Sequence, residues 1–575
     1  MKIKSFLKQV VTIAIGFFIS LIALCSLVVF GFLKLTASDP KPVAPNSVLT
    51  LKMKGRIVEW MPISLFGSNK GMIDFKAVQK AIHQATKDSR ISAIYLDVSN
   101  LRAGWASLEE TRESLLAFKK KGKPIIAYGE SYTQQSYYLA SVADEIILNP
   151  SGILEFKGLA KTVFFYTKLF ENISIKPVIF RIGAYKSYVE PFCLTKMSEE
   201  SRAQTKTWLN SINEHFLTKI SASRGIAVAA LKAHANNLSA VLPNDALHAN
   251  LITRIGYEND AKKLLKEKLK SPSFIKYRIK YRHYSTSETS SEVDKVAVLI
   301  AEGEIINGPS GAGYIGAHDF VKRLKAIQED SSIKAVVLRI NSPGGGVVAA
   351  DLMWKAIEEL KSIKPVVASM SNVAASGGYY IAAPCNYIFA QPTTITGSIG
   401  IFGILPDPSA LMDKIGIHRD VVKTAPSADF LNPRLSCSEL ESKFMHKMLQ
   451  NSYDDFLCKV SNGRKMDVAS VEKLAGGRVY TGLAALNNGL VDELGGLDAA
   501  ITKAASLANL TQKYGVCYFP RLKTRLQQLL NYTTDNIKME ALHSLVQAYP
   551  ILSHYQILSR SHGVQAILPY TIDIS

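Results

Sequence analysis

Cysteine is scarce in this chain, and the six cysteines present follow no metal-binding or disulfide pattern. None of them forms a Cys-x-x-Cys pair, and Cys25 lies inside an apolar run. Structural zinc sites and disulfide frameworks both require closely spaced cysteines. The sequence therefore predicts no metal site and no cofactor, and it leaves open only an isolated Cys437–Cys458 bridge.

Acidic residues are also few relative to basic ones. The chain has 48 Asp and Glu against 68 Lys and Arg, a formal net charge of +20. That balance suits an anionic membrane surface or nucleic acid, and it also suits a solvated basic surface with no partner. No zinc-finger spacing or other nucleic-acid signature accompanies the charge. We therefore expect contact with membrane lipid and no nucleic-acid partner.

The N-terminus carries one long apolar run. It extends from Val10 to Leu33 and is preceded by Lys2, Lys4 and Lys8. A helix of this length spans roughly 30 Å of hydrocarbon, whereas the apolar core of a cleavable signal peptide has about 7–15 residues. The preceding lysines favour a cytoplasmic N-terminus. Residues 1–36 are therefore predicted to be a single transmembrane anchor, with the rest of the chain across the membrane.

The remainder of the chain contains an internal repeat. Residues 91–99 resemble residues 333–341, and Tyr137-Tyr-Leu-Ala matches Tyr379-Tyr-Ile-Ala. The offset is 335 − 93 = 242 at the first match and 379 − 137 = 242 at the second. A constant offset over such a distance indicates duplication.

Each copy alternates short apolar runs with helical stretches. Ala335–Ile340 and Pro365–Ser369 are predicted to be buried strands, and Asp351–Ser362 the helix between them. This alternation is typical of α/β units on parallel strands. The predicted organisation is an anchor (1–36), a first α/β repeat (47–270), a linker (271–293), a second α/β repeat (294–510) and a basic C-terminal tail (511–575).

The second copy contains two glycine-rich motifs, each directly after a predicted strand. Ser376 lies in the sequence Ala-Ala-Ser-Gly-Gly-Tyr, where small neighbours allow a substrate to approach closely. The backbone N–H of Gly377, with one from Gly344 or Gly345, could form an oxyanion hole. Tight turns need the same residues, so either motif alone is also explained by structure.

The repeat helps to separate these explanations. With the offset of 242, Ser376 falls on Gln134, and Gly344 falls on Arg102. Gly345 likewise falls on Ala103, and Ser398 on Phe156. Residues needed only for the fold should be present in both copies, so their loss from the first copy favours a chemical role in the second.

A serine nucleophile needs a base. None of the eleven histidines has a context that marks it as that base; His318 and His418 are the nearest to the glycine motifs in sequence. A lysine can serve if burial or nearby positive charge keeps it neutral. The residues alone do not select one lysine.

The chain resembles the bacterial signal peptide peptidase A family in its long, two-copy form. The motifs that carry this resemblance are Asn341-Ser-Pro-Gly-Gly, Ala374-Ala-Ser-Gly-Gly-Tyr, Thr396-Gly-Ser-Ile-Gly-Ile-Phe-Gly and Arg181-Ile-Gly-Ala-Tyr-Lys-Ser-Tyr-Val-Glu-Pro-Phe. The resemblance implies that Ser376 is the nucleophile of a serine–lysine dyad. It also implies that Lys186 is the general base and that Ser398 orients it.

The repeat agrees with these implied roles. Matching Ala184 to Ala425 gives an offset of 241, which places Lys186 on Ser427. The first copy thus keeps the base and lacks the nucleophile, and the second copy does the reverse. One active site is therefore expected to form from both copies.

The resemblance further implies a crotonase- and Clp-protease-like α/β fold and a homotetramer. It implies location in the bacterial inner membrane, with the catalytic part on the periplasmic side. The expected function is an endopeptidase that degrades cleaved signal peptides and other hydrophobic peptides. Two alternatives remain open, namely a crotonase-type acyl-CoA enzyme and a catalytically inert membrane scaffold.

Overall fold

The computed structural model describes most of the chain beyond residue 42. The described residues are 43–61, 71–269, 278–281, 284, 294–311, 313–430, 437–510, 513–520 and 564–568, with a few between 13 and 24. The predicted anchor, Val10–Leu33, lies almost wholly outside them. Within these ranges no helix combines the length and apolar character needed to cross a membrane.

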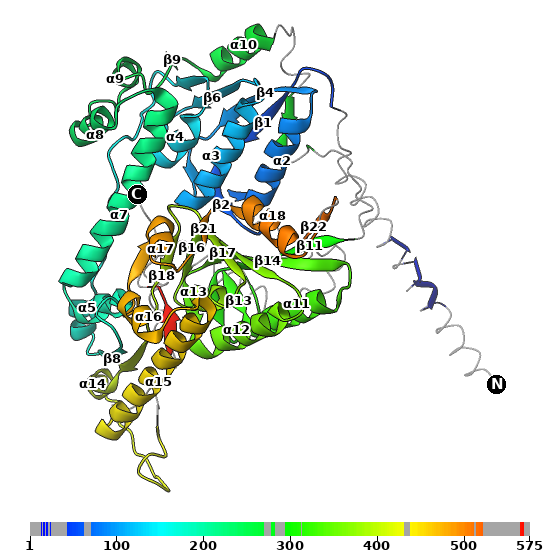
Figure 1. Cartoon of the computed structure of the whole chain (residues 1–575). Coiled ribbons are helices and arrows are strands. Elements are labelled where there is room, and N and C mark those ends of the chain that lie inside the picture. Colours follow the sequence, from blue (N-terminus) through cyan, green and yellow to red (C-terminus); the bar gives the residue numbers. More distant parts are fainter. Residues whose placement is uncertain are drawn as a thin grey trace.

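Two large sheets with the same strand order dominate the structure (Figure 1). The first has the order β10 (Arg278–Lys280), β1 (Ser47–Lys52), β4 (Ile91–Asp97), β6 (Ile125–Gly129), β7 (Glu145–Leu148) and β9 (Arg254–Ile255). The second has the order β22 (Gly515–Phe519), β11 (Lys295–Glu302), β14 (Ile333–Ser342), β16 (Val366–Ala375), β17 (Tyr387–Ala390) and β21 (Glu493–Leu494). All these pairings are parallel. The mixed α/β class predicted from the alternation is therefore confirmed.

Smaller strands complete each copy. In the first copy β2 (Gly55–Val58) pairs with β3 (Met72–Asp74) and β5 (Leu101–Arg102). In the second, β12 (Glu304–Ile306) pairs with β13 (Tyr314–Gly316) and β15 (Gly344–Gly346). The second sheet also gains β18 (Ile395–Gly397) and β20 (Val479–Thr481) beyond β16.

The helices repeat at nearly the same offset as the strands. Helices α2 (Phe75–Lys87) and α3 (Trp105–Lys119) match α11 (Ala317–Glu329) and α12 (Val347–Lys361) at 242. The other pairs are α4 (Gln134–Ala140) with α13 (Gly377–Ala382), α5 (Thr167–Asn172) with α14 (Ser409–Lys414), α7 (Glu199–Arg224) with α15 (Glu439–Arg464), α8 (Val228–Asn237) with α16 (Val468–Leu474), α9 (Pro243–His248) with α17 (Gly482–Asn487), and α10 (Glu258–Leu269) with α18 (Leu497–Leu507).

Both copies extend beyond the boundaries predicted from sequence. Strand β10 lies inside the predicted linker and pairs with β1. Strand β22 lies inside the predicted tail and pairs with β11. These edge strands have three and five residues, too few for a hydrophobic period to be recognised. The remainder of 271–293 lies largely outside the described residues.

Local sequence explains the main elements. The Asp74 carboxylate accepts a hydrogen bond from the Ala77 N–H and caps α2, which satisfies one of the free N–H groups at a helix start. Residues Phe75, Val78, Ile82 and Ala85 of this helix are buried at the three- and four-residue spacing of one helical face. Strand β14 is buried over Ala335–Ile340, as expected for a parallel strand covered on both faces.

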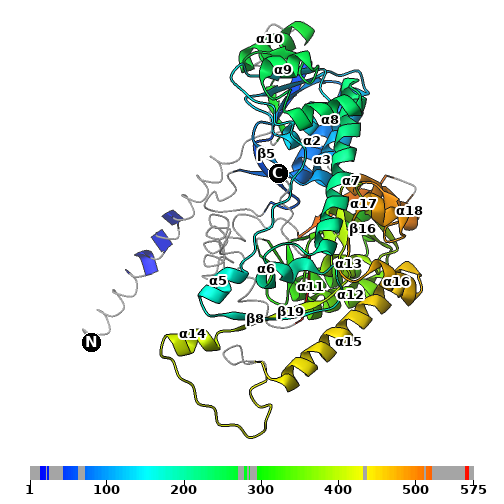
Figure 2. The same ribbon diagram turned by 90° about the vertical axis from the view of Figure 1, so that its left-hand side faces the viewer.

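The two copies are joined by strands and by buried side chains. Strand β8 (Lys176–Arg181) of the first copy pairs antiparallel with β19 (Phe402–Asp407) of the second. Helix α7 runs along the side of both halves (Figures 1 and 2). Asn372 Oδ1 accepts from the Ser107 N–H at 3.0 Å, and a Cβ on Gly104 would lie 2.1 Å from Asn372. Strand pairing and closely fitting buried residues therefore hold the two copies together.

A buried charged cluster lies at the same interface. The Arg339 guanidinium on β14 donates to both carboxylate oxygens of Glu59, at 3.1 and 2.9 Å, and to Glu110 at 2.7 Å. It also donates to the hydroxyls of Ser369 and Ser371. Arg339 has no exposed surface, and both carboxylates belong to the first copy. One cation of the second copy therefore neutralises two anions of the first.

Candidate active site

Ser376 lies at the junction between a strand and a helix. It directly follows β16 and is the N-cap residue of α13, with φ +54° and ψ −117°. A positive φ is unfavourable for a residue with a Cβ, and such strain concentrates at functional sites. The Ser376 N–H donates to the Gly397 carbonyl at 2.8 Å, and the residue is completely buried.

The first copy has no such strain at the equivalent position. Gln134 is the first residue of α4 and is not among the positive-φ residues of the described chain. Its side chain donates to the Gly158 carbonyl at 2.7 Å and accepts from the Gly158 N–H at 2.8 Å. The first copy thus uses this position to secure a loop, so the strain at Ser376 is not required by the fold.

Lys186 of the first copy reaches Ser376 of the second. Its Nζ lies 2.8 Å from Ser376 Oγ, and also 3.0 Å from both the Oγ and the carbonyl oxygen of Ser398. All three residues are completely buried. The lysine that resemblance implied as base is therefore in hydrogen-bonding contact with both the implied nucleophile and the implied orienting serine.

The surroundings of Lys186 favour its neutral form. Burial holds the pKa of Lys186 well below its usual value of 10.5, because a charged ammonium loses its hydration there. A neutral amine has two N–H groups and one lone pair. If the two N–H groups donate to the carbonyl and the Oγ of Ser398, the lone pair remains to accept the Ser376 hydroxyl proton.

The second copy also supports the backbone of the Lys186 loop. The Tyr185 N–H donates to the Gly476 carbonyl at 3.0 Å. A Cβ on Gly477 would lie 2.6 Å from the Lys186 backbone nitrogen, so only glycine fits at 477. The Gln204 amide bridges the copies by donating to the Tyr185 carbonyl and accepting from the Val479 N–H. Sequence reasoning missed Gly477 and Gln204, although the Gly-Gly pair at 476–477 was a visible signal of close backbone contact.

Ser398 resembles Ser376 in its backbone. Its φ is +52°, and its N–H donates to the Arg478 carbonyl at 2.7 Å. Its counterpart in the first copy, Phe156, is buried in that copy's hydrophobic core. The second copy therefore presents a hydroxyl where the first copy packs an aromatic ring.

The glycine loop lies beside the serine turn. Gly344 has φ +107°, and a Cβ there would lie 2.7 Å from the Gly377 backbone nitrogen. A Cβ on Gly345 would instead lie 1.9 Å from the Ile305 carbonyl oxygen. Gly344 and Gly377 are thus adjacent at the site, and a Cβ on Gly377 would also lie 3.1 Å from the Gly345 nitrogen. Gly345 is in addition required by packing against β12.

The other candidate bases do not reach Ser376. His318 is exposed, and its Nδ1 lies 3.1 Å from the Asn307 carbonyl oxygen; His418 is also exposed. Lys423 forms an ion pair with Asp429 at 2.6 Å. Within the described ranges no group of three or more His, Cys, Asp or Glu side chains could hold a metal ion.

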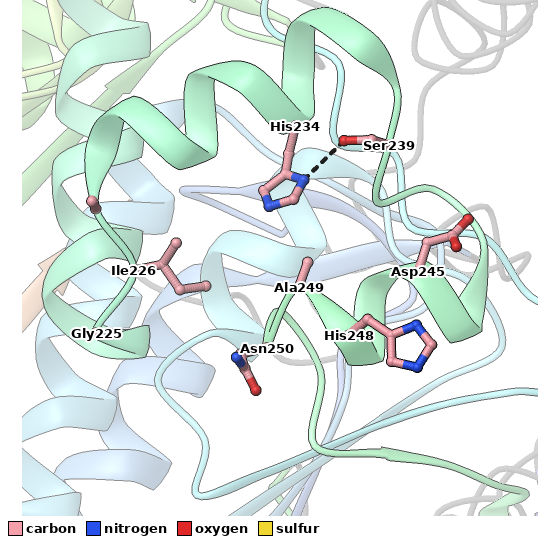
Figure 3. A pocket seen from close by; sticks show the side chains of 9 residues that line it. Gly225, Ile226, His234, Ser239, Asp245, His248, Ala249 and Asn250 are labelled. Atoms are coloured by element: carbon pink, nitrogen blue, oxygen red, sulfur yellow. Dashed lines mark hydrogen bonds between the residues drawn. The ribbon is translucent and has the colours of Figure 1, made fainter.

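A separate surface pocket lies where α7, α8 and α9 meet (Figure 3). Two histidines and one aspartate, His234, His248 and Asp245, are among its lining residues. Figure 3 shows His234 turned toward Ser239, and its Nδ1 lies 2.9 Å from the Ser239 hydroxyl oxygen. All of these residues belong to the first copy, and the pocket contributes nothing to the Ser376 site.

The chain is similar in sequence to known peptidases. Peptidase family S49 matches residues 117–271 and 358–511, one stretch in each copy. Protease 4 of Salmonella typhi is 34% identical over 506 residues, covering 85% of this chain and 81% of that protein. Protease 4 of Haemophilus influenzae is 35% identical over 454 residues, covering 76% of this chain and 73% of that protein.

Similarities that cover a smaller part of the chain also occur. A protein named putative signal peptide peptidase SppA, of Enterococcus faecium, is 38% identical over 194 residues, covering 34% of this chain and 56% of that protein. A ClpP1 mutant from Listeria monocytogenes has 17% identity and a TM-score of 0.25, covering 36% of this chain and 94% of that chain. A TM-score so low supports no conclusion, and the α/β class rests on the chain's own strand order.

Proposed function

The chain belongs to peptidase family S49 and is a serine peptidase, and on this premise we propose that it is a membrane-anchored endopeptidase with a Ser376–Lys186 dyad. One observation carries the proposal. A completely buried lysine lies 2.8 Å from a completely buried, strained serine. That distance is within the range required of a general base.

The proposed mechanism uses groups already in contact. Neutral Lys186 accepts the Ser376 proton as Oγ attacks the substrate carbonyl, while Ser398 holds the amine in place. The N–H groups of Gly377 and of Gly344 or Gly345 stabilise the tetrahedral oxyanion. Lys186 then protonates the leaving amine, and water hydrolyses the acyl-enzyme with Lys186 again acting as base.

We propose signal peptides and other hydrophobic peptides as substrates. The name of the Enterococcus faecium relative specifies such an activity for that protein. In this chain, apolar side chains form a buried cluster where the Lys186 loop meets β19. The cluster contains Tyr188, Val189, Phe192, Phe402 and Ile404.

A fluorophosphonate probe and a hydrophobic reporter peptide test this function. The full-length protein in detergent should label covalently and cleave the peptide. Ser376→Ala should do neither, because it lacks the nucleophile. A folded wild-type protein without label or cleavage would instead favour the acyl-CoA enzyme or the inert scaffold.

We further propose that the anchor lies in the bacterial inner membrane, with the catalytic part on the periplasmic side. The support is the sequence itself, with three lysines before Val10–Leu33 and the whole peptidase after it. Protease added outside intact spheroplasts should digest the catalytic part. Its complete protection would reverse this orientation.

We propose a homotetramer, and the two copies suggest how its contacts form. With the offset of 242, β8 corresponds to residues 418–423 (176 + 242 to 181 + 242) and β19 to residues 160–165. Neither segment forms a strand. Val422 is 97% exposed and Phe164 69%, and the described chain that follows α14 projects from the body (Figure 2).

Within one protomer, β8 pairs with β19. We propose that the corresponding segments, 418–423 and 160–165, form the same kind of contact between protomers. Such head-to-tail contacts generate rings when the rotation closes. The mass of the protein–detergent complex checks the assembly, since four chains are expected and a monomer would contradict it.

Gly344→Ala should lower kcat by roughly 10²-fold or more, in line with the loss of one oxyanion donor. The added Cβ would crowd the Gly377 nitrogen and strain a residue at φ +107°. Gly122→Ala is the matched control, because Gly122 also has positive φ but no atom near its Cβ position. If both variants have the same kcat, Gly344 does not shape the oxyanion hole.

A further inference from the structure

The strands of the first sheet begin at a common edge, and this edge is basic. Because β1, β4, β6, β7 and β9 pair in parallel, the residues that precede them lie side by side. Helix α10 ends at the same edge, where Lys268 pairs with Glu145 at 3.2 Å. It lies at the end of the molecule away from the second copy (Figures 1 and 2). We define the basic edge as residues 87–90, 119–124, 144–145, 253–254 and 263–268.

The basic edge carries ten basic and four acidic residues, a net charge of +6. Three of the acidic residues, Asp88, Asp144 and Glu145, form ion pairs with cations of the edge at 2.8, 3.0 and 3.2 Å. Five lysines are exposed and form no ion pair with any residue that the structure describes. They are Lys87, Lys120, Lys121, Lys263 and Lys266.

The second copy has the same edge without this charge. The matching segments, aligned through the starts of the equivalent strands and the ends of the equivalent helices, are 329–332, 361–365, 386–387, 492–493 and 502–507. They carry three basic and four acidic residues, a net charge of −1. The same fold thus forms with either charge at this edge.

The two copies also separate structural lysines from the others. Lys123 and Lys364 are equivalent, and the Nζ of each donates to two backbone carbonyls at the C-terminal end of α2 or α11. The five exposed lysines do not recur, since their counterparts are Glu329, Ser362, Ile363, Thr502 and Ala505. The fold therefore does not require these five charges, and a partner of opposite charge explains them better.

The predicted anchor enters the fold beside the basic edge. Strand β1 begins at Ser47, 14 residues after Leu33, the last residue of the apolar run (47 − 33 = 14). The Ser47 N–H donates to the Arg90 carbonyl at 2.9 Å. Fourteen residues span at most about 50 Å when fully extended, so the edge lies within that distance of the end of the anchor.

We propose that the basic edge docks the first copy on anionic phospholipid headgroups of the membrane that holds the anchor, an inference that rests on the proposed anchor. Lysines close to an anionic bilayer are attracted to its negative surface potential. The attraction acts within about 10 Å at moderate salt, which the short connection to the anchor permits. The contact fixes the first copy as the part of the peptidase that faces the bilayer.

Acetylation of lysines in the full-length protein, incorporated in lipid nanodiscs, tests this contact. Mass spectrometry gives the rate at which a neutral acetylating ester modifies each amine. Lys120, Lys121 and Lys266 should react several-fold more slowly in phosphatidylglycerol than in phosphatidylcholine nanodiscs, because headgroup phosphates cover the amines and favour their protonated form. The difference should disappear in about 1 M salt, where charges are screened within about 3 Å. Lys322 and Lys355, exposed in the second copy, are internal references and should react equally in both lipids.

A variant of the edge shows whether its lysines act together. Serine replaces four of them and lowers the net charge of the edge from +6 to +2, with the substitutions Lys87→Ser, Lys120→Ser, Lys121→Ser and Lys263→Ser. In this variant Lys266 should react in phosphatidylglycerol nearly as fast as in phosphatidylcholine. The matched control removes four exposed lysines of the second copy and should leave Lys266 protected, with the substitutions Lys322→Ser, Lys325→Ser, Lys355→Ser and Lys473→Ser. Both variants should cleave the reporter peptide in detergent like the wild type.

The outcomes separate the contact from the anchor and from the peptidase function. Equal rates at the edge in both lipids, with the protein incorporated in both, would overturn the contact and leave the anchor standing. Failure of the full-length protein to enter either nanodisc would overturn the anchor and the contact together. Protection of Lys322 and Lys355 as strong as that of the edge, or undiminished protection of Lys266 in the edge variant, would also overturn the proposal.

Discussion

Lys186→Ala is expected to lower kcat/KM for peptide cleavage by roughly 10³-fold or more, because it removes the amine that contacts Ser376. Ser376→Ala should have a comparable effect. The double variant should be little worse than either, since two groups that act as a unit are not additive. Lys186→Arg should also be inactive, because a guanidinium does not deprotonate.

Lys364→Ala is the matched control for this experiment. Like Lys186, Lys364 is buried and has a pKa lowered by burial. Its Nζ donates to the backbone carbonyls of Ile327 and Asp330. Lys364 lies just before the start of β16, whereas Ser376 directly follows its end, so the two residues are at opposite ends of this strand. Its loss should reduce stability and leave kcat/KM close to the wild-type value. Equal losses of activity in both variants would mean that Lys186 acts only through the fold.

The pH dependence follows from the same burial. Activity should rise with pH as Lys186 loses its proton, with a midpoint well below 10.5. Between the lowered pKa and 10.5 the unfolded state binds more protons than the folded state, so the lysine's contribution to stability rises with pH in that window. At neutral pH Lys186→Met should therefore be at least as stable as the wild type. A midpoint near 10.5 would contradict a buried base.

Arg339→Met should destabilise the protein by about 3–5 kcal/mol, the usual cost of leaving buried charges without their partner. Glu59 and Glu110 would lose the guanidinium that neutralises both of them. Because these carboxylates belong to the first copy and Arg339 to the second, the two copies should also separate more easily. Chemical unfolding with one probe in each copy measures both effects.

Lys334→Met makes the same kind of change on the same strand. Lys334 is about half exposed and pairs with Asp294 at 3.5 Å, so its loss should cost about 0–1 kcal/mol. A similar value for Arg339→Met would show that the buried cluster does not hold the copies together.

The cost of Arg339→Met should also grow as pH rises. Burial raises the pKa of Glu110 to about 7, above its value of 4.5 in the unfolded chain. Between these values the folded state binds more protons, so this group's contribution to stability falls as pH increases. Without Arg339 the ionised Glu110 carboxylate loses its countercharge and keeps the hydrogen bond from the Leu497 N–H at 2.8 Å. We expect a larger difference from the wild type at pH 8 than at pH 5, and an equal difference would contradict this coupling.

The duplication and the candidate serine were readable from the sequence because their signals are local. A strand, a glycine-rich turn and a helix follow one another within a few residues around Ser376, and the structure has β16 and α13 at that place. The offset of 242 predicted matching elements, and α2 and α3 match α11 and α12 at that spacing. The role of Lys186 could not be predicted in this way, because the residues around a lysine in the sequence do not show whether it is buried. Only the resemblance to a family selected it.

Tertiary structure alone decided the features that depend on segments far apart in the chain. The 2.8 Å contact joins residues separated by 190 positions, and docking of the two copies buries the lysine enough to lower its pKa. The positive φ of Ser376 is likewise not a property of its sequence. Pairing of Ala566 with Gly345 brings the tail to the site across more than 200 residues. Sequence determines the local conformation and chemistry of each segment, but desolvation and strand pairing arise only when distant segments pack together.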